Sequence, residues 1–121
     1  MRKSLFSVVL LMFSFCVAAE LISSDSYIDF GEIELGESEF IEVELINTYD
    51  FPIKVTDIFL DADFTVFDLN ENCLGVLAPD DSCYIEVVFT PNEEDWFMGE
   101  IDIQSDQGDN FAIELFGEGF W

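Results

Sequence analysis

The chain has 121 residues, with 27 acidic side chains, three basic ones and no histidine, which gives a formal net charge of −24 at pH 7. This charge excludes nucleic acid and anionic membrane surfaces as electrostatic partners. Without histidine, serine and cysteine nucleophiles lack their usual base and histidine-based metal sites cannot form. Because 50% of the residues are hydrophobic and 16% are aromatic, the composition favours a packed core over a disordered acidic chain.

The first 19 residues have the three parts of a secretory signal peptide. A short basic region at 1–3 is followed by an apolar stretch at 5–17, and small residues precede Glu20. The apolar stretch is shorter than the roughly 20 residues that span a bilayer, which disfavours an uncleaved membrane anchor. We therefore expect residues 1–19 to be removed.

Cleavage before Glu20 also removes one of the three cysteines, Cys16. Lipidation of Cys16 is disfavoured because the bulky Phe15 precedes it. The mature chain, residues 20–121, then carries 27 acids against the single base Lys54, a formal charge of −26. Its length suits one small domain, and no membrane span is expected in it.

From residue 27 onward, several segments alternate between apolar and acidic residues, as in Glu42-Val43-Glu44-Leu45. In a strand, this alternation sends aliphatic side chains to one face and carboxylates to the other. No stretch of ten residues has a helical period, and turn residues recur at short intervals. We expect an all-β fold of two sheets packed face to face, with a closed barrel as the alternative. The expected strands span 27–30, 40–47, 53–60, 64–69, 83–89, 99–105 and 111–116.

Acidic residues gather in several of the expected turns. The segment 68–72 resembles the first half of a calcium loop, but Cys73 and Pro79 stand where such a loop needs glycine and glutamate. Carboxylates on loops suit calcium, so a calcium site and a set of solvated turn residues are both open interpretations. The candidate ligands are Asp61, Asp63, Asp80, Asp81, Asp106 and Asp109.

Cys73 and Cys83 lie on either side of a turn around Pro79. A disulfide can span this separation if the flanking segments run side by side, and it would indicate an oxidising compartment. A structural bridge fits better than a redox site, because the pair lacks the close spacing and the helix terminus that activate thiolates.

Apolar residues also occur where exposed chain is expected. Trp96, Phe97 and Met98 follow three acids in an expected loop, and Phe120 and Trp121 lie beyond the last expected strand. Aromatic side chains are favoured anchors of protein interfaces. These five residues are candidate partner contacts, and the alternative for Trp96 and Phe97 is that they fold back to cap the end of the sandwich.

Five motifs follow one another along the chain: an Asp-Phe-Gly opening, an asparagine turn with a proline, a cysteine pair with Phe-x-Pro, an alternating strand, and a final Gly-x-Gly. Together they resemble the ASH (abnormal-spindle, Hydin) type of immunoglobulin-like domain, including its bacterial secreted relatives, the choice-of-anchor D modules. The resemblance covers about residues 27–119. It implies an immunoglobulin-like β-sandwich of about seven antiparallel strands. The motifs lie in 28–36, 45–53, 73–91, 99–106 and 113–119.

The chain departs from this family at two places. Tyr49 stands where family members usually have glycine shortly after the asparagine, and the acidic and aromatic segment 93–98 replaces a bland polar turn. The residues at 93–98 lie between two of the shared motifs, and we expect the function particular to this protein to depend on them.

No constellation of side chains indicates catalysis, because no carboxylate pair stands out as buried or unusually spaced. We expect a non-enzymatic, exported module, periplasmic or extracellular, that binds or assembles with a protein and needs no cofactor unless calcium binds. Strand capture in the manner of pilus chaperones is disfavoured, because they grip their clients through basic residues and Lys54 is the only base in the mature chain. Adaptation to salt is a further explanation of the acidity.

Overall fold

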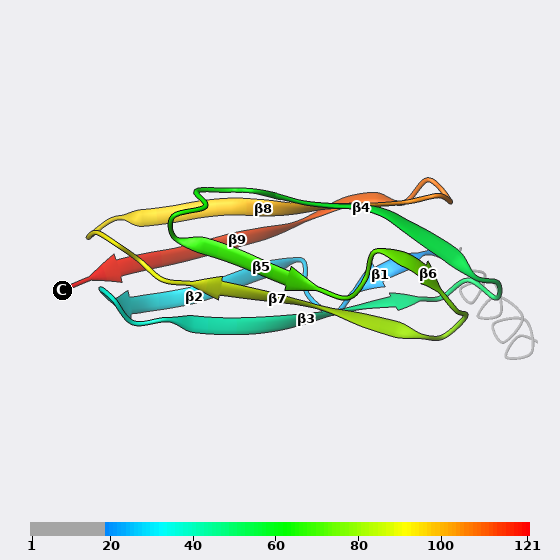
Figure 1. Cartoon of the computed structure of the whole chain (residues 1–121), viewed down its shortest axis with the longest axis horizontal. Helices are drawn as coiled ribbons and strands as arrows, with labels where there is room; N and C mark the ends of the chain where they lie inside the picture. The colour runs from blue at the N-terminus through cyan, green and yellow to red at the C-terminus, as the bar shows by residue number, and fades with distance from the viewer. Residues whose placement is uncertain (1–18) are drawn as a thin grey trace, which may run out of the picture.

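The computed structural model describes residues 19–121, so the predicted signal peptide, apart from Ala19, lies outside the described residues. Within this range the regular elements are nine strands and no helix (Figure 1). It contains no helix long and apolar enough to cross a membrane. The strands are β1 (Leu21–Ser23), β2 (Tyr27–Glu34), β3 (Glu39–Asn47), β4 (Ile53–Asp61), β5 (Phe67–Glu71), β6 (Gly75–Leu77), β7 (Ser82–Phe89), β8 (Trp96–Ser105) and β9 (Asn110–Phe120).

The strands form two sheets, which confirms the predicted immunoglobulin-like sandwich. One sheet has the order β1-β3-β7-β5 and the other has the order β2-β9-β8-β4-β6. The prediction of about seven antiparallel strands was incomplete in two respects. The short strands β1 and β6 are additional, and β2 pairs with β9 in parallel.

On each side of the sandwich, one continuous segment of the chain leaves the edge of one sheet and enters the edge of the other. β1 lies at one edge of the four-stranded sheet, and β2, which follows it, lies at one edge of the five-stranded sheet. At the opposite edges, β5 belongs to the four-stranded sheet and β6, which follows it, to the five-stranded sheet. Each side of the sandwich is therefore closed by one continuous segment. The edge strands β1 and β6 have three residues each, which limits their own pairing with other chains.

The inner faces of the sheets meet in an aromatic core. The ring of Phe89 lies 5.0 Å from Phe67, 5.4 Å from Phe30 and 5.8 Å from Phe97, measured between centroids. All four side chains are buried. Aromatic pairs at these separations stabilise a core beyond their buried area.

The start of β5 differs from the prediction, which placed a strand from residue 64. The carbonyl of Asp63 accepts hydrogen bonds from the backbone N–H groups of Val66 and Phe67, and its carboxylate accepts one from Thr65. This turn occupies residues 64–66, so β5 begins only at Phe67, and Phe64 is exposed.

The Phe-x-Pro and Gly-x-Gly motifs pack against each other. A Cβ atom on Gly117 would lie 2.6 Å from the Phe89 ring, and one on Gly119 would lie 2.6 Å from the Cβ of Pro91. Side chains at these two inward positions would clash with their neighbours. The glycines therefore let β9 approach the end of β7 and the segment that follows it.

The cysteine pair and the asparagine turn fix the other end of the sandwich, where β1 and β6 lie (Figure 1). Cys73 and Cys83 form the predicted disulfide, with their Cα atoms 5.1 Å apart. The bridge ties the chain to β7 at the point where it leaves β5 for β6. Asn47 is fully buried, and its amide donates to the carbonyls of Phe51 and Leu77, both at 3.0 Å.

Candidate protein-binding surface

The prediction of a loop at residues 96–98 is wrong, because strand β8 begins at Trp96. The β8–β9 hairpin extends to Trp96, which lies opposite Glu118. Because side chains alternate along a strand, Phe97 faces the core and is 9% exposed, whereas Trp96 and Met98 face outward and are 61% and 71% exposed. Phe97 is therefore a core residue and is not available to a partner.

The outward residues of β8 and β9 form an aromatic patch, which we define as Trp96, Met98, Phe116 and Phe120. Met98 lies directly opposite Phe116, and the rings of Trp96 and Phe116 are 5.1 Å apart. Phe120 shares the outward face of β9 with Phe116 and lies diagonally across from Trp96. Trp121 follows β9 and is 81% exposed.

The sequence prediction missed Phe116, which it placed at the end of a strand without assigning its face. The alternation of β9 could have indicated it, because Ile113 and Leu115 are buried and Phe116 therefore points to the opposite side. Its side chain is half-buried beneath its apolar neighbours.

Carboxylates surround the aromatic patch on the same face. Glu32 of β2 lies opposite Glu118, and Glu34 lies opposite Phe120. Farther along the sheet, Glu100 lies between Asp61 of β4 and Glu114 of β9, so that three adjacent strands place carboxylates in one row. The patch is thus an apolar area bordered by negative charge, with one carboxylate, Glu118, between Phe116 and Phe120.

The outer face of the four-stranded sheet provides a comparison. Phe40 of β3 is 61% exposed, the same fraction as Trp96, and lies opposite Val88. Glu42 and Glu86 lie directly opposite each other, as Glu100 and Glu114 do on the other sheet. In the described part of the chain no aromatic ring packs on Phe40 or on Tyr84 of β7, which is also exposed on this face. This face therefore has no aromatic cluster.

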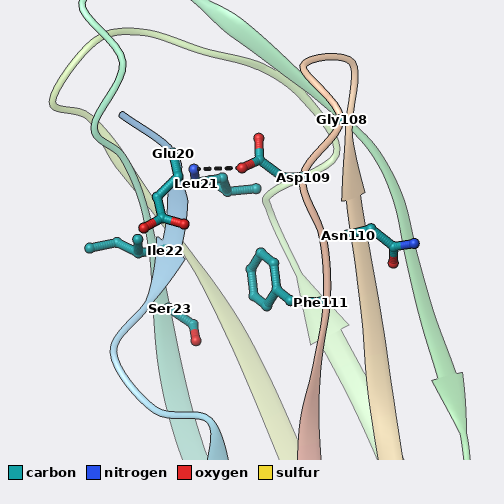
Figure 2. A pocket seen from close by; sticks show the side chains of 8 residues that line it. All are labelled: Glu20, Leu21, Ile22, Ser23, Gly108, Asp109, Asn110 and Phe111. Carbon is teal, nitrogen blue, oxygen red and sulfur yellow. Dashed lines mark hydrogen bonds between the residues drawn. The ribbon is translucent and has the colours of Figure 1, made fainter. Parts of the chain in front are cut away.

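A hollow of about 420 Å³ opens between β1 and the start of β9 (Figure 2). Figure 2 shows Phe111 directed into this space and the Leu21 N–H donating to the Asp109 carboxylate, at 3.1 Å. Asp109 also accepts hydrogen bonds from the hydroxyls of Tyr49 and Ser105. Partial burial, together with the Asp109 hydrogen bond, raises the pKa of the Tyr49 hydroxyl above its ordinary value. Asp109 therefore joins β1, the asparagine turn and the β8–β9 turn.

The candidate calcium ligands lie in three separate segments, 61–63, 80–81 and 106–109. Asp63 accepts hydrogen bonds from Thr65, Asp81 from the Ser82 N–H, and Asp106 from the Lys54 N–H. Asp80 adopts a positive φ of 63° in the turn before β7, and Asp61 is exposed at the end of β4. Within residues 19–121, no three acidic or cysteine side chains come together as a metal site. Apart from Asp61, which ends β4, these aspartates are turn residues in this structure.

The crossing segments at the edges, the parallel β2–β9 pair and the interlocking Phe-x-Pro and Gly-x-Gly motifs define an ASH-type immunoglobulin-like domain. A family model described as Cep192 domain 4 matches residues 18–120, and the chain belongs to this family. The solved ASH / PapD-like domain 7 of human CEP192 aligns with a TM-score of 0.66 at 14% identity, covering 83% of this chain and 84% of that one.

Two bacterial structures share the fold. The secreted serine protease VesC from Vibrio cholerae aligns with a TM-score of 0.62 at 18% identity, covering 90% of this chain but only 24% of VesC. The CupB2 chaperone of Pseudomonas aeruginosa aligns with a TM-score of 0.58 at 13% identity, covering 81% of this chain and 55% of the chaperone. A comparison with curated proteins finds no match. The chain thus spans a minor part of VesC and about half of the chaperone.

Proposed function

We propose that this chain is an exported, non-catalytic module that binds a protein partner through the aromatic patch. The observation that carries the proposal is the cluster of large apolar side chains on the outer face of β8 and β9, where Trp96 and Met98 are mostly exposed. Exposed aromatic clusters on a rigid sheet are typical of protein interfaces, because they bury large areas at little cost in conformational entropy.

Three features support a binding role without chemistry. The sequence has no histidine, the Asp109 carboxylate in the hollow accepts hydrogen bonds from three protein donors, and the fold is shared with a protein described as a chaperone. A calcium-dependent role has less support, because the turn aspartates hydrogen-bond to their own turns and to neighbouring segments.

Export is supported by the signal-peptide pattern and by the Cys73–Cys83 disulfide, which persists in oxidising compartments. β1 begins at Leu21, so cleavage before Glu20 would leave every strand intact. Mass spectrometry of the protein from the exported fraction of its native cells should find a mature chain that begins at Glu20. A chain that retains residues 1–19 would contradict this part of the proposal.

The binding role is tested by affinity capture from the exported fraction of the native cells. We expect wild-type protein to retain a specific partner, Trp96→Ala to lose it, and Phe40→Ala to keep it. Phe40→Ala is a matched control, because both aromatic side chains are 61% exposed and lie on opposite sheets. Equal loss with both variants, or no effect of Trp96→Ala, would overturn the assignment of the surface.

A further inference from the structure

We propose that the partner of the aromatic patch is a basic protein segment, in which lysine or arginine side chains lie beside an apolar one. This inference rests on the proposed function and adds the chemistry of the partner. It follows from the way apolar and acidic residues are arranged in rows across the five-stranded sheet.

The first observation is an uncompensated row of negative charge. Asp61, Glu100 and Glu114 lie side by side on β4, β8 and β9. Like charges directly opposite each other destabilise a sheet. Lys54 is the only basic side chain in residues 19–121, and it lies opposite Val76 in the β4–β6 pair, away from this row. The row therefore lacks a counter-charge within the described chain.

The second observation is that this row borders the aromatic patch. Met98 and Phe116 occupy the adjacent row, two residues from Glu100 and Glu114 along their strands. Two residues of a strand span about 7 Å. A partner whose apolar side chain rests on Met98 and Phe116 thus brings a neighbouring lysine or arginine within reach of Glu100 or Glu114.

Glu118 lies within the patch, between Phe116 and Phe120 along β9 and between Trp96 and Glu32 across the strands. A cation directed toward Glu118 also lies near the indole face of Trp96, where a cation–π contact adds to the attraction. Negative charge beside the apolar area and within it therefore favours a segment that combines an apolar side chain with cations.

The charge also excludes other occupants of the patch. A second copy of this chain brings an equally acidic face, and anionic lipid headgroups are repelled in the same way. A basic protein segment is the occupant that satisfies both the apolar and the acidic residues.

The test titrates three synthetic peptides of equal length into the purified protein and measures Kd by calorimetry. One peptide combines leucine with lysine, one combines serine with lysine, and one combines leucine with glutamate. We expect only the leucine–lysine peptide to bind, with Kd rising at least about tenfold between about 50 mM and about 500 mM NaCl, because salt screens the rim charges.

Matched variants locate the site. Trp96→Ala should weaken binding roughly thirtyfold, the loss typical of an interface anchor. Glu100→Gln/Glu114→Gln should weaken it at least about threefold at low salt and flatten its salt dependence. Phe40→Ala and Glu42→Gln/Glu86→Gln, which alter the equivalent features of the other sheet, should leave Kd within about twofold.

Several results would overturn the inference. Equal affinity for the serine–lysine peptide, or equal loss in the Glu42→Gln/Glu86→Gln variant, would mean attraction to the overall charge only. Binding of the leucine–glutamate peptide, or self-association that Trp96→Ala abolishes, would identify a different occupant. Partner capture that depends on Trp96 but no binding of the leucine–lysine peptide would reject the basic partner while the proposed function stands. Failure of both experiments would reject both.

Discussion

Single buried residues hold the turns of this sandwich in place, and Asn47 is the clearest case. Its amide donates to Phe51 and Leu77, and its side-chain oxygen accepts from the Tyr49 N–H at 2.8 Å. One side chain thereby joins the end of β3 to the following turn and to β6. The sequence indicated a turn at Asn47. It could not indicate the hydrogen bond to Leu77, because the two residues are 30 positions apart and only the fold brings them together.

Asn47→Ala leaves two carbonyls and one N–H in this region without their partner. We expect a loss of at least about 2 kcal/mol in the free energy of unfolding, because each buried unsatisfied group is costly. Urea unfolding should show a lower midpoint at an unchanged m-value. Asn70→Ala, at an exposed position of β5, serves as the control. An equal change in both variants would contradict the role of Asn47.

Asp63 provides a prediction for acidic pH. Hydrogen bonds from the Thr65 hydroxyl and then from its N–H lower the pKa of Asp63 below its ordinary value of 3.8. Its contribution to stability is therefore present above about pH 3.8 and is lost as the pH falls through the lowered pKa. In Thr65→Val, the Asp63 pKa should rise toward 3.8 in a carboxyl ¹³C NMR titration. The control is Thr56→Val, which removes a hydroxyl that donates to the Gln104 carbonyl. This variant should leave the Asp63 pKa unchanged.

At the scale of the strands, the short edge strands β1 and β6 are the least predictable from sequence. The expected strands 40–47 and 83–89 match β3 and β7 to within one residue, because their alternation is long and regular. β1 and β6 have three residues each, too few for a period to be recognised. Trp96, Phe97 and Met98 are all apolar, so their alternation between core and surface is invisible without the neighbouring strand.

The disulfide stabilises the segment that leads from β5 to β6. Replacing both cysteines, in Cys73→Ala/Cys83→Ala, should lower the free energy of unfolding by about 2.5 kcal/mol through the entropy of the open loop. Hydrogen exchange should accelerate mainly in β6 and the segment from residue 72 to 82, since the bridge anchors these residues to β7. An even acceleration across both sheets would contradict this local role.

At the scale of the whole molecule, the charge of −26 on residues 20–121 opposes compaction. The melting temperature should rise with sodium chloride, because screening weakens repulsion among the surface carboxylates. Calcium should raise it no more than magnesium does at the same ionic strength. A rise particular to calcium and reversed by a chelator would contradict this expectation and restore the calcium-dependent interpretation.

The family and the two-sheet architecture could be predicted from ordered motifs, because the paired cysteines, the Phe-x-Pro and the Gly-x-Gly each have a packing role. The arrangement of the candidate binding residues was predicted only in part. Trp96, Met98 and Phe120 lie on one face, whereas Phe97 is buried and Phe116 was missed. Which outward residues of two strands become neighbours depends on the register of β8 and β9, which alternation alone does not fix.

The most direct test of the account is site-specific photo-crosslinking in the native cells. A photoreactive amino acid replaces Met98 in one variant and Phe40 in another, so that each outer face carries one probe. We predict a discrete protein adduct from position 98 and none from position 40, with the adduct lost when Trp96→Ala is added. An adduct only from position 40, or equal adducts from both faces, would contradict the assignment of the aromatic patch as the binding surface.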